Sequence, residues 1–263
     1  MLFPNTKILF DPQGIDTYAP SFTIPHFVWS EANLASALGT EFTFQDTVLH
    51  EGNCGPSAFE SALNGPGAYT GESEKSKAEV QTPEFRKKAV EFVRDNRALL
   101  SEMYRPWVDS FIATYNDPNQ TDLTNPLIWF CKARFDVSAF REEIVKYAAA
   151  HRSELIQKYG EESVEEVITT YNDPTKMDPE TIMYTGYIVW ECAANLYGHT
   201  INLYSRSGVA FNPQHQTRPT FFELDEHGNV KPIATFAPEG KEPLPPPLNL
   251  MLFGPHYCTL IPK

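Results

Sequence analysis

One cysteine, Cys54, lies in a sequence setting that can activate a thiol. It follows the glycine-bearing loop Glu51–Asn53 and precedes Pro56–Leu63, which can form a helix because proline is tolerated in the first turn. The N-terminal end of a helix dipole favours a thiolate, and the backbone N–H groups there can bind an oxyanion. Gly52 has no Cβ, which lets the backbone approach a substrate carbonyl. Buried structural cysteines occur in similar settings, so the local pattern leaves both interpretations open.

The other cysteines and histidines show no second chemical centre. Cys131 and Cys192 lie in apolar helical segments and are predicted to be core residues. The four cysteines form no CxxC pair, which argues against a zinc site or a disulfide scaffold and suits a reducing compartment. The histidines other than His256 show no HExxH or comparable metal spacing, and His50, although close to Cys54 in sequence, is not favoured as a catalytic group. We therefore predict no metal and no cofactor.

The segments that must position Cys54 are short strands and helices. The expected strands are Glu41–Leu49, Thr200–Tyr204, Thr220–Leu224, Leu248–Phe253 and Tyr257–Ile261. Helices are expected over Ser30–Leu38 and Ile188–Leu196, the second ended by Gly198. Residues 68–81 are polar and small and predict a mobile loop, and the proline-rich segment 238–247 predicts an ordered or extended loop. His256 falls between the last two strands.

The middle of the chain is helical and contains an internal repeat. Thr82 and Pro83 are typical of a helix start, with a capping hydroxyl followed by proline at the first helical position. Identical residues recur 55 positions later at Phe85/Phe140, Arg86/Arg141, Val90/Val145, Arg97/Arg152, Leu100/Leu155 and Tyr104/Tyr159. At an offset of 56, the run Thr114–Pro118 matches Thr170–Pro174. We interpret the pattern as a duplicated helix–helix–turn unit, which forms a helical lobe at about 82–180.

The composition excludes several classes of protein. The chain has 263 residues, of which 41% are hydrophobic, enough for a real core and one large domain with an insertion. Lys plus Arg number 21 and Asp plus Glu 34, a net charge of −13 that argues against nucleic acid or an anionic membrane as the main partner. No apolar run reaches the ~18 residues of a membrane span. The first residues show no secretory signal, so a cytosolic protein is expected.

Four blocks of the sequence together resemble the ovarian-tumour (OTU) family of cysteine deubiquitinases. The blocks are Glu51–Cys54 with Ala58, the helical segment 85–96, the segment 188–204, and Pro255-His256-Tyr257 near the end. The resemblance implies an α/β (α+β) fold of the papain type, with a small mixed β-sheet flanked by helices. It also implies that Cys54 is the nucleophile, His256 the base and Glu51, Gly52 and Asn53 the oxyanion loop. The activity implied is hydrolysis of isopeptide bonds in ubiquitin chains or conjugates. We expect the protein to act as a monomer.

The sequence departs from the family pattern around the third catalytic residue. Many family members carry Asp or Asn two residues after the histidine, where this chain has Cys258. Some supply an acid from ahead of the cysteine, and by that resemblance Asp46 is our choice. Asp16 and Asn249 are the reserves. Further departures are Glu51 in place of the usual aspartate and Gly55-Pro56 in place of a hydrophobic pair.

Alternative functions differ in what they require of the sequence. A papain-like peptidase would have glutamine where Val48 stands, and an Asn-Ser-Trp motif after the histidine, where only seven residues remain. Proteases with the chain order His, Asp, Cys are excluded because only 53 residues precede Cys54. A non-catalytic OTU-like module that binds ubiquitin remains an alternative.

The helical insertion carries two further expectations. Insertions of this kind after the cysteine helix resemble those of OTU enzymes that intracellular bacteria deliver into host cells. Acidic clusters within the helical insertion are candidates to bind the basic face and tail of ubiquitin. These clusters are Glu161-Glu162, Glu165-Glu166 and Asp178-Pro179-Glu180.

Overall fold

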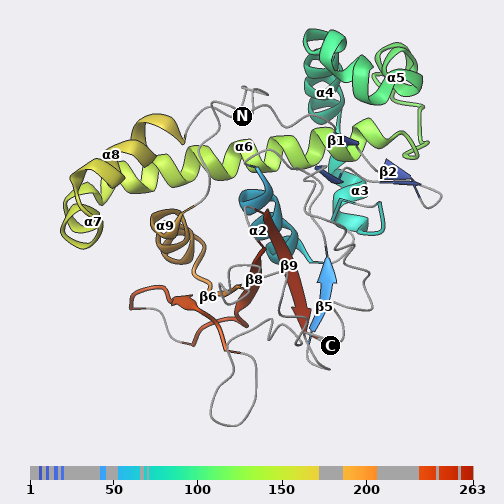
Figure 1. The fold of residues 1–263 in the computed structure, drawn as a ribbon. Helices are drawn as coiled ribbons and strands as arrows, with labels where there is room; N and C mark the ends of the chain where they lie inside the picture. The colour runs from blue at the N-terminus through green and yellow to red at the C-terminus, as the bar shows by residue number, and fades with distance from the viewer. Residues whose placement is uncertain are drawn as a thin grey trace, which may run out of the picture. The chain divides into compact units, whose positions relative to one another are not determined.

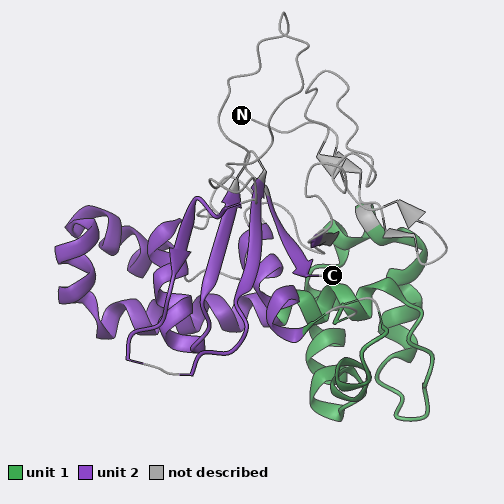
Figure 2. Cartoon of the chain, turned by 90° about the horizontal axis from the view of Figure 1, so that it is seen from below, with its two compact units in different colours: residues 1–28, 65–135 green, residues 29–64, 136–263 purple. Residues whose placement is uncertain are grey.

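The chain forms two compact units in the computed structural model. One comprises residues 1–28 and 65–135, and the other residues 29–64 and 136–263 (Figure 2). The structure describes residues 6–7, 10–11, 15–16, 19–20, 42–45, 53–65, 68–69, 71–171, 186–205, 231–240, 243–253 and 256–262. The predicted elements Ser30–Leu38 and Thr220–Leu224 lie outside these ranges.

The second unit is built on a five-stranded mixed sheet of order β5-β9-β8-β6-β7 (Figure 1). The strands are β5 (Phe42–Gln45), β6 (Ile201–Ser205), β7 (Ala234–Phe236), β8 (Leu248–Phe253) and β9 (His256–Pro262). The β6–β8 pair is parallel and the other pairs are antiparallel. The predicted fold class, a small mixed sheet flanked by helices, is therefore confirmed, and β7 is a strand that the sequence did not predict.

One face of this sheet packs against α2 (Cys54–Asn64) and α9 (Tyr187–Tyr197). Side chains alternate along a strand, so the register places Leu250, Tyr257 and Thr259 on the same face. Thr259 Oγ1 donates a hydrogen bond of 2.8 Å to the carbonyl oxygen of Ala58, which fixes β9 against α2. Helix α9 ends as predicted at Gly198, whose φ of 73° is left-handed.

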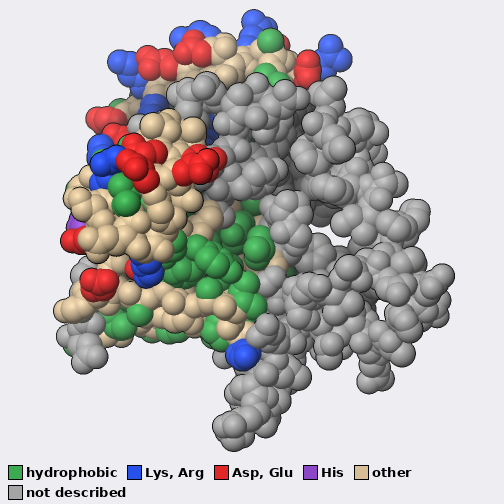
Figure 3. Space-filling view, turned by 60° about the vertical axis from the view of Figure 1, so that its left-hand side comes forward, with side chains coloured by type: hydrophobic (Ala, Val, Ile, Leu, Met, Phe, Trp, Pro, Cys, Tyr) green, Lys and Arg blue, Asp and Glu red, His purple; other side chains and the backbone are tan. Residues whose placement is uncertain are grey.

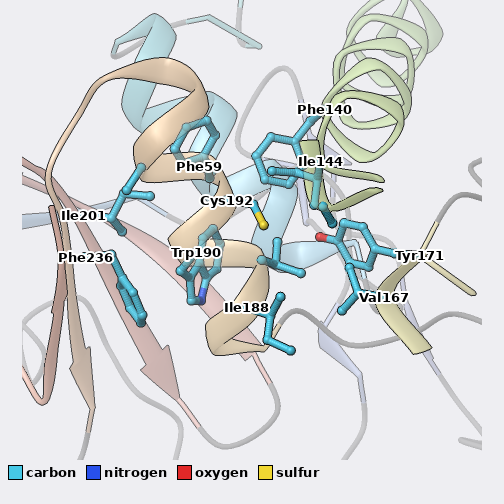
Figure 4. Close-up of a cluster of buried hydrophobic side chains, with 14 of the residues drawn as sticks. Phe59, Phe140, Ile144, Val167, Tyr171, Ile188, Trp190, Cys192, Ile201 and Phe236 are labelled. Atoms are coloured by element: carbon cyan, nitrogen blue, oxygen red, sulfur yellow. The ribbon is translucent and has the colours of Figure 1, made fainter. Parts of the chain in front are cut away.

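The core beneath this face combines α2, α9 and the C-terminal half of α6 (Pro126–Ala150). Figure 4 shows Phe59, Phe140 and Trp190 converging there, and the ring centroid of Phe59 lies 5.0 Å from that of Phe140 and 6.3 Å from that of Trp190. Cys192 is fully buried in this cluster, and burial raises its pKa to about 12. Cys131, in α6, is also fully buried, with its pKa raised by the same cause. Both cysteines are core residues, as predicted.

The first unit corrects one expectation. Residues 74–80, within the predicted mobile loop 68–81, form the helix α3 (Glu74–Val80). Ser73 caps this helix by accepting a hydrogen bond from the backbone N–H of Ser76, and Val80 is buried. The helix has only two apolar residues, Ala78 and Val80, too few for a helical period to be visible in the sequence. This unit also contains the short antiparallel pairs β1 (Thr6–Lys7) with β4 (Ala19–Pro20) and β2 (Phe10–Asp11) with β3 (Ile15–Asp16).

The first helix break and the end of the last helix fall at equivalent positions in the two repeat copies. The first copy forms α4 (Pro83–Asp95) and α5 (Arg97–Thr114); the second forms the end of α6, then α7 (Arg152–Tyr159) and α8 (Glu161–Thr170). The break residues Asn96 (φ −103°, ψ 18°) and His151 (φ −108°, ψ 24°) have nearly the same backbone conformation. Thr82 caps α4 as predicted, accepting from the N–H of Phe85.

In each copy, a buried arginine donates a hydrogen bond to the end of the last helix. Arg86 Nη1 donates to the carbonyl oxygen of Tyr115 at 3.1 Å, and its guanidinium lies 5.2 Å from the Tyr115 ring centroid. Arg141 Nη1 donates to the carbonyl oxygen of Tyr171 at 3.2 Å, with its guanidinium 4.4 Å from that ring centroid. Equivalent residues therefore make equivalent contacts, which supports the predicted duplication.

The structure also explains why the repeat offset changes from 55 to 56. In the first copy the chain kinks at Tyr104 (φ −124°, ψ 28°) without ending α5. In the second copy α7 ends at the equivalent Tyr159, and one added residue, Gly160, separates it from α8. Gly160 has a φ of +85°, which glycine adopts without steric cost. The second copy belongs to the same compact unit as the sheet. The predicted extent of a separate lobe, about 82–180, stays a prediction.

Candidate active site

Cys54 lies at the N-terminus of helix α2, as expected, and the helix begins at Cys54, two residues before the predicted segment Pro56–Leu63. The N–H of Ser57 donates to the carbonyl oxygen of Asn53 at 2.9 Å, which closes the first turn around the thiol. The first turn contains no acidic residue, so no carboxylate there opposes a thiolate. Cys54 is 3% exposed and Asn53 is equally buried. This local geometry is that of a thiol at the positive end of a helix. The loop residues Glu51 and Gly52 lie outside the described residues.

His256 is the first residue of β9, so the final strand begins one residue before the predicted segment Tyr257–Ile261. Its backbone pairs with Phe253 at the end of β8. Its side chain lies outside the described part of the structure, so the contact between its imidazole and Cys54 stays a prediction.

The packing of α2 on β9 nevertheless brings the start of the strand to the start of the helix. Thr259 and Ala58 are hydrogen-bonded. Along α2, Cys54 lies one helical turn before Ala58, a distance of about 6 Å. Along β9, Tyr257 lies two residues before Thr259, a distance of about 7 Å. Cys54 and Tyr257 belong to the same buried cluster, and the charge of Cys54 raises the pKa of Tyr257, so these two steps along α2 and β9 run in the same direction. The neighbour of His256 in the sequence therefore lies beside the candidate nucleophile.

Two aromatic residues complete this buried environment, and sequence reasoning assigned neither to the site. The indole Nε1–H of Trp190 donates to the hydroxyl oxygen of Tyr257 at 3.4 Å, and the two rings meet edge to face with centroids 5.3 Å apart. Burial raises the pKa of Tyr257 to about 12, and the charge of Cys54 adds to this effect. The sequence did offer a signal for them, because both aromatic residues lie within the sequence blocks that resemble the OTU family.

The strand that precedes Asp46 runs beside the strand that His256 opens. Asp46 can reach the start of β9 only if the segment before it lies next to that strand, and β5 pairs with β9 in antiparallel register. From Phe42, opposite Pro262, to Gln45, opposite Thr259, β5 runs toward the His256 end of β9. Asp46 follows Gln45 directly and itself lies outside the described residues. Its role stays a prediction.

The two reserve residues are placed less favourably. Asn249 is buried in β8 opposite Leu260, four strand residues from His256 and thus about 13 Å along the strand. Its Oδ1 accepts a hydrogen bond from Asn202 Nδ2 at 3.1 Å. The backbone of Asp16 lies in β3, in the first unit, and its side chain is outside the described residues. The structure does not bring Asn249 to the start of β9.

Within the described ranges, no group of three or more His, Cys, Asp or Glu side chains could hold a metal ion. None of the described helices combines the length and hydropathy needed to cross a membrane.

Comparisons with known proteins give no sequence match, either to a protein-family model or to a curated protein. Three similar solved structures are OTU proteins. The viral OTU domain protease from Dera Ghazi Khan virus is 16% identical, with a TM-score of 0.28, and the match covers 49% of this chain and 65% of that one. The viral OTU domain protease from Farallon virus is 14% identical, with a TM-score of 0.31 and coverages of 86% and 88%. A complex of h/ceOTUB1 with ubiquitin aldehyde and UBCH5B~Ub is 11% identical, with a TM-score of 0.43 and coverages of 87% and 80%. All three TM-scores are below 0.5.

Proposed function

We propose that this protein is an OTU-type cysteine protease that hydrolyses isopeptide bonds in ubiquitin chains or conjugates. The observation that carries the proposal is the position of Cys54, at the N-terminus of α2 and beside the start of β9, whose first residue is His256. The sequence blocks that resemble the OTU family supply the substrate class.

In the proposed mechanism, His256 takes the proton of Cys54 and the thiolate attacks the carbonyl carbon of the C-terminal glycine of ubiquitin. The backbone N–H of Cys54 and those of the loop Glu51–Asn53 hold the oxyanion. Protonated His256 gives its proton to the departing lysine amine, which leaves a thioester. A water molecule, deprotonated by His256, attacks the thioester, and the thiolate departs and is reprotonated.

A ubiquitin probe with a C-terminal electrophile tests this function. We expect one covalent adduct per chain, located at Cys54 by peptide mass spectrometry and unchanged in a Cys192→Ser control. Tight retention of ubiquitin without an adduct would instead identify a non-catalytic binding module. Cleavage of unrelated peptides without capture of the probe would identify a papain-like peptidase of other specificity.

We also propose that the protein is a cytosolic monomer, since its scattered cysteines suit a reducing compartment, and that ubiquitin and polyubiquitin are its partners. Delivery into a host cytosol by a bacterium is the origin that the helical insertion suggests.

Replacing the proposed orienting acid, Asp46→Ala, should lower kcat while leaving Cys54 reactive toward the probe. A carboxylate on the far ring nitrogen holds a catalytic imidazole in the correct tautomer. Its loss should cost about ten-fold or more in kcat, since the oxyanion hole and substrate binding persist. Steady-state cleavage of diubiquitin measures the effect. Asn249→Ala and Asp16→Ala should be much milder, and the reverse ranking would show that Asp46 is the wrong residue.

Among the residues that the structure describes, basic partners neutralise only part of the acidic surface of α8. Arg152 forms ion pairs with Glu161 and Glu165. Glu162 and Glu166 are exposed and lie one helical turn apart. Figure 3 shows acidic side chains next to basic ones on the face that it presents. Glu162 and Glu166 are therefore the described acids most suited to meet a basic surface of ubiquitin, whereas Asp178 and Glu180 lie outside the described residues.

The double substitution Glu162→Gln with Glu166→Gln should raise KM more than it lowers kcat. Exposed charges that face a basic partner mainly affect its encounter and binding, so we expect an increase in KM of about two- to five-fold. Glu84→Gln with Glu91→Gln, on the exposed face of α4, is the matched control. If KM and linkage preference both survive the α8 substitutions, this surface is only structural.

A further inference from the structure

The first unit contains a cavity that the proposed ubiquitin chemistry does not use. Its volume is about 320 Å³, at the lower end of the range for ligand pockets. The lining comes from α5, from the loop that follows α5 and from the first turn of α6, and all of it belongs to residues 65–135. Cys54 and His256 belong to the second unit and do not line this cavity.

Three of the side chains that line the cavity are aromatic: Trp107, Phe111 and Tyr115. Phe111 and Tyr115 are buried and stacked on each other, with ring centroids 4.5 Å apart. Trp107 is only half-buried, so part of its indole remains accessible to a ligand. The face of an indole attracts both alkyl groups and cations.

The internal repeat shows that the shared fold does not require Trp107. The equivalent residue of the second copy, 56 positions later, is Ser163, which is exposed. The next residue is valine in both copies, and both Val108 and Val164 are buried. The helix therefore packs through Val108, and the position of Trp107 accepts a small polar residue. A large aromatic side chain that the packing does not need, at the edge of a cavity, indicates a role in binding.

The hydroxyl groups of the lining can only accept hydrogen bonds from a ligand. Ser110 Oγ donates to the carbonyl oxygen of Trp107 at 3.0 Å, and Thr114 Oγ1 donates to that of Ser110 at 2.8 Å. The hydroxyl of Tyr115 donates to the carbonyl oxygen of Val80 at 2.7 Å. Each hydroxyl has one proton, and these protons are used within the chain, so the free lone pairs of the oxygens are what a ligand can meet.

Asp122 gives the lining a negative charge. Hydrogen bonds from the side chain and the backbone N–H of Thr124 hold the pKa of the Asp122 carboxyl below its usual value. A carboxylate accepts about four hydrogen bonds, so Thr124 leaves places for a ligand. Among the described residues, no lysine, arginine or histidine lines the cavity. Arg86, which contacts Tyr115, is not part of the lining, and backbone carbonyl oxygens accept its N–H groups.

We propose that this cavity binds an arginine side chain of a partner protein. A guanidinium is a cation with five N–H donors and no acceptor, which matches a lining of one carboxylate and several hydroxyl oxygens. Its planar faces can stack on the indole of Trp107 while its fork binds the carboxylate of Asp122, and a lysine ammonium offers neither the plane nor the fork. The proposal goes beyond the proposed protease function and does not rest on it.

Saturation-transfer NMR of the full chain with a short peptide that carries one arginine tests the proposal. We expect a Kd on the order of 1 mM, as suits a single side chain. The same peptide with citrulline, the uncharged isostere of arginine, should bind about ten-fold more weakly, because it loses the charge-assisted hydrogen bonds. A lysine peptide should also bind more weakly than the arginine peptide. Asp122→Asn keeps the shape of the side chain and removes its charge, so it should weaken the arginine peptide about ten-fold and abolish the preference over citrulline.

Trp107→Ser introduces the residue that the second copy already has, so it should lose the peptide while its thermal unfolding stays close to that of the wild type. Asp95→Asn is the matched control, since Asp95 is an exposed acid at the end of α4 and lies outside the lining. It should leave binding unchanged. Equal binding of the arginine and citrulline peptides would overturn the proposal, and so would unchanged binding in Asp122→Asn or no saturation transfer to the arginine peptide. Because the assay needs neither ubiquitin nor catalysis, its failure is distinguishable from a failure of the proposed function.

Discussion

Cleavage of diubiquitin should be abolished by Cys54→Ala and by His256→Ala. Without the thiol no thioester forms, and without the imidazole neither the thiol nor the departing amine exchanges its proton. Removal of either member of such a pair costs on the order of 10³-fold or more in kcat. The measurement is cleavage of all eight diubiquitin linkages on gels, which also shows the linkage preference.

Cys258→Ala is the matched control for this experiment. Cys258 is another buried cysteine, two residues after His256 in the same strand, and it should be dispensable. Full activity of Cys54→Ala or of His256→Ala would contradict the assignment. If both variants lose cleavage but still retain ubiquitin non-covalently, binding and catalysis are separable functions of one site.

Arg86→Ala should cause the largest loss of stability in the first unit. The guanidinium donates to the carbonyl oxygens at the ends of two helices and of a loop: Gln81 at 3.1 Å, Tyr115 at 3.1 Å, Asp117 at 2.6 Å and Gln120 at 2.6 Å. Its removal leaves several carbonyls without their donor in a buried site, and we expect a loss of about 3 kcal/mol or more in the free energy of unfolding. Arg86→Lys should lose most of the same stability, because an ammonium cannot replace the planar fork.

Chemical denaturation of the full chain measures this effect. Lys87→Ala is the control, since Lys87 is the exposed neighbour of Arg86 and its loss should change the free energy of unfolding by less than about 0.5 kcal/mol. Arg141→Ala should destabilise the second unit in the same way. Unfolding of Arg86→Ala at the same denaturant concentration as Lys87→Ala would show that the arginine contacts are not required.

Several elements could be predicted because their causes are local in the sequence. Helix α9 is a continuous apolar segment ended by Gly198, and β8 and β9 are apolar runs on either side of a Gly-Pro pair. The start of α2 at Cys54 follows from a turn before it and a proline in its first turn. The repeat was visible because the buried arginine and its tyrosine recur at nearly the same spacing.

Other features could not be predicted because they depend on packing between distant segments. Helix α3 has too few apolar residues to show a period, and β7 is a three-residue strand that exists only through its pairing with β6. The contact of Trp190 with Tyr257 joins residues 67 positions apart. Its place beside Cys54 depends on how α2, α9 and β9 pack, which no local pattern encodes.

The pairing of the last strand has a consequence for how the protein is made. Each arginine contact spans about 30 positions, 29 for Arg86 with Tyr115 and 30 for Arg141 with Tyr171, whereas the bond from Thr259 to Ala58 spans 201. Contacts between near neighbours form faster than contacts that close a long loop. During synthesis on the ribosome, the helical copies can fold while β9 does not yet exist, and Cys54 gains Tyr257 and His256 only after β9 emerges. If the proposed function holds, a partly synthesised chain carries the thiol without its base, and proteolytic activity would begin only once the chain has been extended through β9.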